Sequence, residues 1–241
     1  MAMLAFLSMM SAVLLGLFSK TKLPSEHLYD DITTVIRLVA NIFIVMTSLL
    51  LGLMLNSAKN TLETNNHNIR ALATELILLD RTMRGLGLEA EGARRHLVEY
   101  VQTALKEAVA LEENPQAEAS LEAAGAGLKA ILVSDEQKVA LWNDARQLYQ
   151  QVVRQRWVVL DASGGTIPTP LVGMVILWLA IIFASFGYRA PRNTIVMASC
   201  CLAGLLISAT LYLILDMDTP SSSMIRASNA PIQRALAQLQ R

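Results

Sequence analysis

The sequence has few charged residues and no net charge. Of its 241 residues 17% are charged, and 20 basic side chains balance 20 acidic ones. A chain without excess positive charge lacks the electrostatic footprint by which proteins attract nucleic acid, so we expect no nucleic-acid partner. Because 54% of the residues are hydrophobic, the composition indicates an integral membrane protein rather than a soluble one.

Residues that carry catalysis or bind metals are also scarce. The three histidines are dispersed, and Cys200 and Cys201 are adjacent within an apolar run. The motifs G-x-G-x-x-G, H-E-x-x-H and G-x-S-x-G do not occur. Glu63 and His67 are four residues apart, as metal ligands on a helix can be, but they form a single pair. We therefore predict no enzyme activity, no metal site and no cofactor.

Long apolar runs dominate the two ends of the chain. A membrane-crossing helix needs about 20 predominantly apolar residues. The runs lie at residues 2–18, 35–55, 171–186 and 195–215. We predict an all-α, polytopic membrane protein with four transmembrane helices and the lipid bilayer as its surroundings. The expected domains are residues 1–56 (first and second transmembrane helices with their loop), 57–166 (a helical extramembrane domain), 167–218 (a transmembrane hairpin) and 219–241 (a C-terminal tail).

The extramembrane domain has helical periodicity nearly throughout. Apolar residues spaced alternately by three and four form a heptad seam, with Asn65 filling one gap: Leu62, Ile69, Leu72, Leu76, Leu79, Met83 and Leu86. This pattern predicts a partly coiled-coil stalk that continues the second transmembrane helix. Further helices are expected over 97–111 and 135–159, with a weaker one over 119–133, and no strand is expected.

The second transmembrane helix carries a polar stripe. Arg37, Asn41, Ser48 and Gly52 lie within roughly 60° of one another when each residue turns the helix by about 100°. Polar groups at membrane depth are costly when they face lipid. The stripe therefore faces either other protein, as a helix-packing surface, or a water-filled path. The second alternative makes these residues candidates for lining a pore.

Two acids follow the last apolar run, and a mixed charge cluster lies in the extramembrane domain. Asp216 and Asp218 sit at a helix C-terminus, where a carboxylate opposes the helix dipole and needs a partner. The candidate partners are Arg226, a cation, or the positive end of a neighbouring helix. With a cation as the partner, the acids form an ion-attracting mouth, which in an oligomer becomes a ring of carboxylates. The cluster around the predicted turn is a candidate charge network, with Asp80, Arg81, Glu89 and Arg94 as its members.

Three blocks of sequence resemble the bacterial bestrophin-like membrane family. They are "LDRTMRGLGLEAEGARR", "LWLAIIFASFGYRAPRN" and "LYLILDMDTPSSSMIRASNAP", and the resemblance covers residues 35 to 236. That family usually has tyrosine-glycine-proline-glutamate where this chain has "LGLE", so Leu86 and Leu88 depart from the pattern and Glu89 matches it. Its most specific matches are Trp178, Phe183, Phe186, Pro191 and Asn193 in the hairpin, and Asp216, Asp218, Pro220, Arg226, Ser228 and Pro231 after it.

The resemblance implies a function. Bestrophins are pentameric anion channels, so it implies a homo-oligomer that conducts inorganic ions through a pore lined by the second transmembrane helix. Bestrophin pores are ringed by aromatic residues, for which this helix offers only Phe43. The alternative is a non-conducting scaffold or signalling protein that self-associates through its stalk. The calcium-binding acidic stretch of bestrophins is reduced here to two acids, so we expect no calcium site.

Two indications of membrane orientation disagree. We expect a multi-pass protein of the cell inner membrane. The short loops hold Lys20, Lys22, Arg37, Arg189 and Arg192, which favours a periplasmic extramembrane domain. The resemblance to bestrophins favours a cytoplasmic one. We adopt the periplasmic side as the expectation.

Overall fold

The computed structural model describes residues 2–22, 29–106, 114–133, 135–162, 165–189, 193–218 and 230–240. Within them the regular structure is entirely helical, which confirms the all-α prediction. The elements are α1 (Ala2–Lys22), α2 (Tyr29–Leu86), a 3₁₀ turn η1 (Gly87–Ala90), α3 (Glu91–Lys106), α4 (Pro115–Lys129), α5 (Glu136–Asp161), α6 (Thr169–Arg189), α7 (Thr194–Asp218) and α8 (Ala230–Leu239).

The chain divides into two compact units. The membrane unit comprises Met1–Lys59 and Thr166–Asp218, and the polar unit comprises Asn60–Gly165 and Thr219–Arg241. Helix α2 is continuous for 58 residues and contributes to both units. The second apolar run therefore continues as a helix into the polar sequence after it, as the absence of a helix breaker predicts.

Three of the described helices are long and apolar enough to cross a membrane. They are α6, α7 and α2, whose candidate span begins at Arg37. The apolar stretch of α1, Met3–Phe18, is shorter. The structure thus supports membrane crossing for three of the four predicted transmembrane helices.

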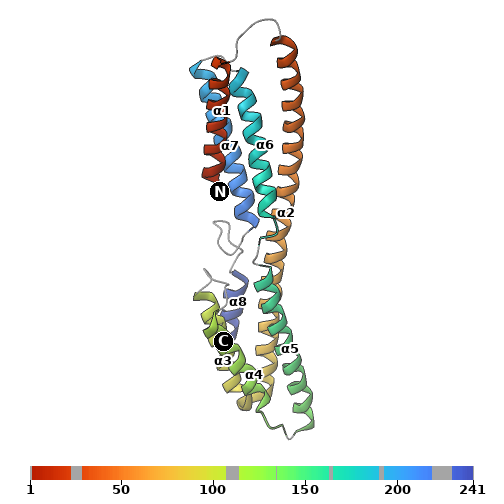
Figure 1. Ribbon diagram of the computed structural model, residues 1–241. Coiled ribbons are helices and arrows are strands. Elements are labelled where there is room, and N and C mark those ends of the chain that lie inside the picture. The colour runs from red at the N-terminus through yellow and green to blue at the C-terminus, as the bar shows by residue number, and fades with distance from the viewer. Residues whose placement is uncertain are drawn as a thin grey trace. The chain divides into compact units, whose positions relative to one another are not determined.

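Helix α1 packs closely on α6 and α7 within the membrane unit (Figure 1). A methyl group added at Gly16 would collide with the backbone carbonyl of Ala184, and one added at Gly187 would collide with that of Val13. The two glycines therefore let the α1 and α6 backbones touch, as small residues do in membrane helix pairs. Met9 and Val13 fill the contact next to them and are buried.

The heptad seam of α2 is the core of the polar unit. Its residues from Ile69 to Leu86 are at most 4% exposed, and they pack against α3, α4, α5 and α8 through residues such as Leu97, Leu121, Val152 and Leu239. The seam is therefore filled by helices of the same chain. The periodicity correctly predicted a buried face, but the surface that covers it comes from within the chain.

Two local signals fix the ends of helices in the polar unit. Gly87 has φ of 81°, a left-handed conformation that turns the chain from α2 to α3 at little steric cost. Asn114 precedes α4, and its side-chain oxygen accepts hydrogen bonds from the backbone N–H groups of Gln116 and Ala117 at 2.8 and 3.2 Å. Pro115 then occupies the first turn, where a missing N–H costs nothing.

Helix α8 belongs to the polar unit. It is a 10-residue amphipathic helix whose apolar face joins the core of that unit through Ile232, Ala235 and Leu239. The described part of the predicted C-terminal tail is thus a docked element of the core of the polar unit. A helix this short is marginal in water on its own, so it depends on this docking.

Candidate functional site

The polar stripe of α2 lies on the surface of the membrane unit. Arg37, Asn41, Ser48 and Gly52 are all exposed. On a different side of the same helix, Ala40, Thr47, Met54 and Ala58 are at most 5% exposed. The stripe is therefore not used for packing within its own chain, and another surface or water must cover it when the unit sits in a bilayer.

Ser48 and Gly52 differ in what they expose on the surface of the stripe. The hydroxyl of Ser48 donates to the carbonyl oxygen of Ile44 at 2.8 Å, which satisfies its proton within the helix and leaves its oxygen able to accept. No atom lies within 4 Å of the position that a Cβ would take at Gly52. The stripe thus presents one guanidinium, one amide and one hydroxyl along an unobstructed face.

The structure separates Phe43 from this stripe. Its ring packs against Trp178 of α6, with centroids 5.9 Å apart and a tilt of 60°, a favourable arrangement for aromatic pairs. Phe43 therefore attaches α2 to α6 inside the membrane unit. Of the five pore-lining candidates, four share the exposed face and Phe43 lies on the packed side.

Asp218 contacts the N-terminal approach to a neighbouring helix, one of the kinds of partner expected for it from the sequence. Its carboxylate accepts hydrogen bonds from the backbone N–H groups of Thr166 and Ile167 at 3.1 and 3.0 Å. These residues lead into α6, where Pro168 and Pro170 interrupt the run of N–H donors. The residue is 3% exposed. The side chain at the end of α7 therefore caps the approach to α6 and closes the hairpin at its base.

Asp216 is also buried, at 9% exposure. Both acids lie inside the membrane unit at the end of α7, and neither presents an open carboxylate to solvent. Arg226, the predicted partner of these acids, lies outside the described residues.

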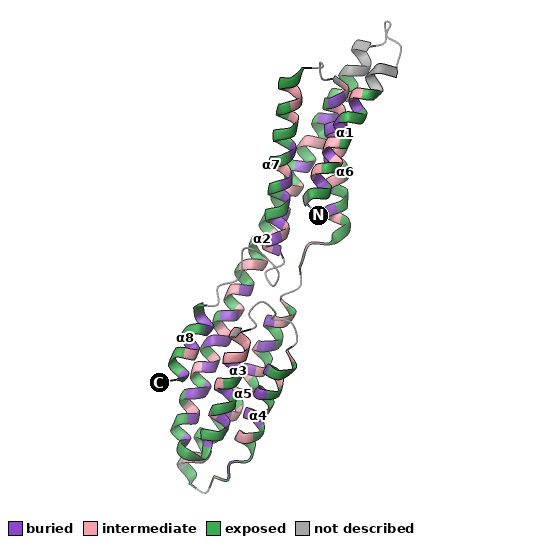
Figure 2. Ribbon diagram, turned by 90° about the vertical axis from the view of Figure 1, so that its left-hand side faces the viewer, coloured by how far each residue is buried: buried purple, intermediate pink, exposed green. Residues whose placement is uncertain are grey.

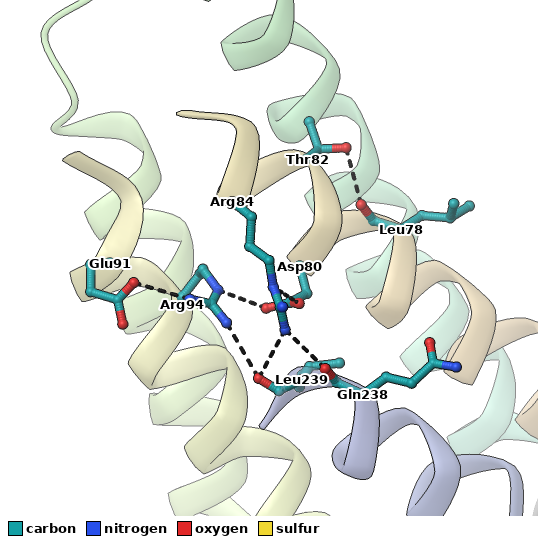
Figure 3. A network of polar contacts seen from close by, with 8 residues as sticks. All are labelled: Leu78, Asp80, Thr82, Arg84, Glu91, Arg94, Gln238 and Leu239. Carbon is teal, nitrogen blue, oxygen red and sulfur yellow. Dashed lines mark hydrogen bonds and ion pairs between the residues drawn. The ribbon is translucent and has the colours of Figure 1, made fainter. Parts of the chain in front are cut away.

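A second polar site lies in the polar unit around Asp80, which is 3% exposed. Its Oδ2 accepts a hydrogen bond from Arg84 Nε, and its Oδ1 accepts one from Arg94 Nε, both at 2.8 Å. Arg94 also pairs with Glu91 at 3.0 Å. Figure 3 shows the two guanidinium groups meeting at the carboxylate. Burial opposes the charge of Arg94, but the hydrogen bond and charge of Asp80 raise its pKa on balance.

The same two arginines hold the end of α8. Arg84 Nη2 donates to the carbonyl oxygens of Gln238 and Leu239 at 2.8 and 3.2 Å, and Arg94 Nη2 donates to Leu239 at 3.3 Å. The last carbonyls of a helix have no partner within the helix and carry partial negative charge. Asp80 thus orients two cations that cap α8 (Figure 3).

The predicted charge network is regrouped by the structure. Asp80 and Arg94 meet as predicted, with Arg84 and Glu91 as their further partners. Glu89 instead pairs with Lys138 of α5 at 3.2 Å. Arg81 is exposed and lines a polar surface pocket of about 280 Å³ beside Asp80 and Arg84.

The described residues offer no cluster for a metal ion, since no three side chains of His, Cys, Asp or Glu converge among them. The candidate site with an open polar surface in the membrane unit is therefore the α2 stripe. The polar unit contributes a charge network that holds its helices together.

Comparison with known proteins places the chain in a family. No curated protein and no solved structure matches it. A family model described as the Bestrophin-like domain matches residues 3–232, which is nearly the whole sequence. Together with three apolar spanning helices, this match identifies a membrane protein. The chain belongs to the Bestrophin-like family.

Proposed function

We propose that this protein is a homo-oligomeric ion channel whose pore is lined by the polar stripe of α2. One observation carries the proposal. Arg37, Asn41, Ser48 and Gly52 are exposed on a helix of which another face is packed against its own unit. A stripe with a guanidinium and an amide would be costly against lipid acyl chains. Several copies around an axis would place the stripes against water and against one another.

The charges favour anions as the conducted species. Arg37 is an exposed charge on the stripe, while Asp216 and Asp218 are buried. Repeated around an axis, Arg37 becomes a ring of positive charge, and basic rings select anions in the way that acidic rings select cations. The amide N–H₂ of Asn41, one turn further along the helix, can donate hydrogen bonds to an anion that has lost part of its hydration shell.

The alternative of a scaffold that self-associates through its stalk loses its main support. The seam that would mediate such association is buried in the core of the polar unit. Self-association through it would first require α3, α4, α5 and α8 to leave. A channel requires no such rearrangement, because its proposed lining is already exposed.

Planar-bilayer recording of the purified protein tests the proposal. In asymmetric chloride salt we expect discrete single-channel currents that reverse near the chloride equilibrium potential. Asn41→Leu should change the unitary conductance, and Arg37→Gln should move the reversal potential away from that of chloride. Leu177→Asn serves as the control, because Leu177 is 59% exposed on α6 and does not belong to the stripe. Absence of currents from folded, oligomeric protein contradicts the proposal.

The location of the polar unit is a separate proposal. The distribution of basic residues in the short loops favours a periplasmic polar unit in the cell inner membrane. Protease treatment of intact spheroplasts tests this: cleavage in the polar unit before lysis supports the periplasmic side, and cleavage only after lysis supports the cytoplasmic side.

A further inference from the structure

A small pocket opens on the surface of the polar unit where α2 meets the end of α8. Its volume is about 280 Å³, and it is lined by Ile77, Asp80, Arg81 and Arg84 of α2 and by Gln238 of α8. The four α2 residues are spaced by three and four positions, so they share one face of the helix within roughly 100°. The pocket therefore has charged walls and one apolar wall.

The pocket is open to solvent. In Figure 2 buried and exposed residues alternate along α8 and along the polar-unit part of α2, because each helix packs its apolar face into the core and leaves another face uncovered. Arg81 of α2 and Gln238 of α8 are both exposed residues of the pocket lining. A small molecule can therefore reach the pocket without any movement of the two helices.

The two arginines of the pocket have unused hydrogen-bond donors. Arg81 makes no hydrogen bond or ion pair with any described residue. Arg84 donates through Nε to Asp80 and through Nη2 to the last carbonyl oxygens of α8. Its Nη1 has no partner among the described residues. Since a guanidinium carries five N–H donors and keeps its charge, the pocket offers donors from two cations.

Asp80 holds Arg84 in place for such a ligand. Its carboxylate is 3% exposed and accepts from Arg84 Nε and from Arg94 Nε, so both of its oxygens are engaged. Figure 3 shows Arg84 held between this carboxylate and the end of α8. A guanidinium that is already oriented loses less side-chain entropy when it binds a ligand.

The charge, shape and size of the lining favour a small carboxylate. Two arginines and one aspartate leave one net positive charge around the pocket. A planar carboxylate matches the fork of a guanidinium, and its single charge balances that of the lining. A phosphate would bring more negative charge next to Asp80. The volume lies below the range of about 300–1,000 Å³ that is usual for drug-sized ligands, which indicates a smaller molecule.

We propose that this pocket binds a small organic carboxylate, whose carboxylate group bridges Arg81 and Nη1 of Arg84 while its carbon chain lies against Ile77. Arg84 also holds the last carbonyls of α8, so the bound anion adds to the contacts that keep α8 on the polar unit. The site lies within the polar unit, and its occupation does not depend on the proposed channel.

Ligand-observed NMR titration of the purified protein in detergent tests the site at constant ionic strength. The probes are butyrate, its neutral analogue butyramide, and inorganic phosphate. We expect butyrate to bind at least fivefold more tightly than phosphate, and butyramide to show no binding. Arg81→Gln should weaken butyrate binding at least tenfold. It should fold normally, because the side chain that it replaces is exposed and has no partner among the described residues.

Arg95→Gln is the matched control, because Arg95 is exposed but does not line the pocket. Its affinity for butyrate should stay within twofold of that of the unmodified protein. Equal weakening by Arg81→Gln and Arg95→Gln would indicate general charge attraction and overturn the proposal. Absence of butyrate binding to the folded protein would overturn it as well. Phosphate binding more tightly than butyrate would overturn the assignment to carboxylates.

Protection of α8 from trypsin gives a second measurement. Trypsin cleaves after Arg234 when α8 opens, and a ligand that binds only the docked state lowers the open population. Butyrate at about ten times its dissociation constant should therefore slow this cleavage roughly tenfold. Arg81→Gln protein should be cleaved at the same rate with and without butyrate. Unchanged cleavage of the unmodified protein would overturn the placement of the anion beside α8.

Discussion

Asp80→Asn tests whether the arginine network holds α8 on the polar unit. The substitution keeps the shape of the side chain but removes the charge that both guanidinium groups share. Arg94 has a side chain only 17% exposed, so weakening its bond to Asp80 should cost about 2–3 kcal/mol. The Arg84 side chain is 36% exposed, so solvent screening reduces the contribution of its ion pair with Asp80 to about 0.5 kcal/mol. Together these give about 3 kcal/mol.

Limited trypsin digestion measures the consequence. Arg234 lies in α8 and is exposed, but a protease needs the helix to open locally before it can cleave. Opening of α8 breaks the bonds from the two arginines to its carbonyls, and Asp80 acts on these bonds only by orienting the arginines, so about 3 kcal/mol is an upper bound on the change in opening free energy. When opening is fast relative to cleavage, this bound corresponds to a rise in cleavage rate of up to roughly a hundredfold. The fragment released after Arg234 is identified by mass spectrometry, and the rate is compared between variants in the same detergent.

Glu91→Gln is the matched control. Glu91 also pairs with Arg94, but its side chain is 50% exposed, so its loss should cost less than about 1 kcal/mol and change cleavage by less than about fivefold. Equal cleavage rates for Asp80→Asn and Glu91→Gln would refute the inference that Asp80 organises the cap of α8.

Three further predictions follow from the packing of single residues. Asp218→Ala removes the acceptor of two backbone N–H groups and should destabilise the membrane unit by about 1–3 kcal/mol. Asp218→Asn should reduce the stability by less. A thermal melt that shows no change for either variant would contradict the capping role. Gly187→Val should separate α1 from α6 and lower the melting temperature more than Gly173→Val, because no atom lies within 4 Å of a Cβ at Gly173; equal melting temperatures would argue against the close contact. Burial raises the pKa of Glu75, whose Oε2 has no hydrogen-bond partner among the described residues, despite the charge of Arg154. Its ionisation therefore destabilises the fold as pH rises through that pKa, so Glu75→Gln should stabilise the protein at pH 7 and not below about pH 3, where the carboxyl is protonated in both states; denaturation at the two pH values checks this.

The helices themselves could be predicted from the sequence because their signals are local. The length of the apolar runs predicted the membrane-spanning segments. Apolar residues spaced three and four positions apart predicted the buried face of α2. Asn114, Pro115 and Gly87 lie at helix boundaries that suit their own conformational preferences. The exposure of the polar stripe also agrees with its chemistry, since an arginine and an asparagine resist burial against apolar side chains.

What the sequence could not give are contacts between distant segments. Asp218 meets N–H groups 51 and 52 residues away; its position at a helix end predicted a partner such as the positive end of another helix, but not which helix supplies it. Arg84 meets α8 across 154 residues. The heptad seam likewise indicates that a partner exists without saying which helix it is, and the covering helices proved to belong to the same chain.

Cysteine accessibility in the stripe tests the channel account most directly. In a Cys200→Ser and Cys201→Ser background, Ser48→Cys places a thiol in the proposed pore, and Leu53→Cys places one at an apolar position of the same helix outside the stripe, where Leu53 is 59% exposed in the single chain. A charged, membrane-impermeant methanethiosulfonate is applied during single-channel recording. The account predicts rapid, irreversible loss of current for Ser48→Cys and unchanged current for Leu53→Cys. Unchanged current in Ser48→Cys channels, with the thiol shown to be unmodified, would contradict a pore lined by α2.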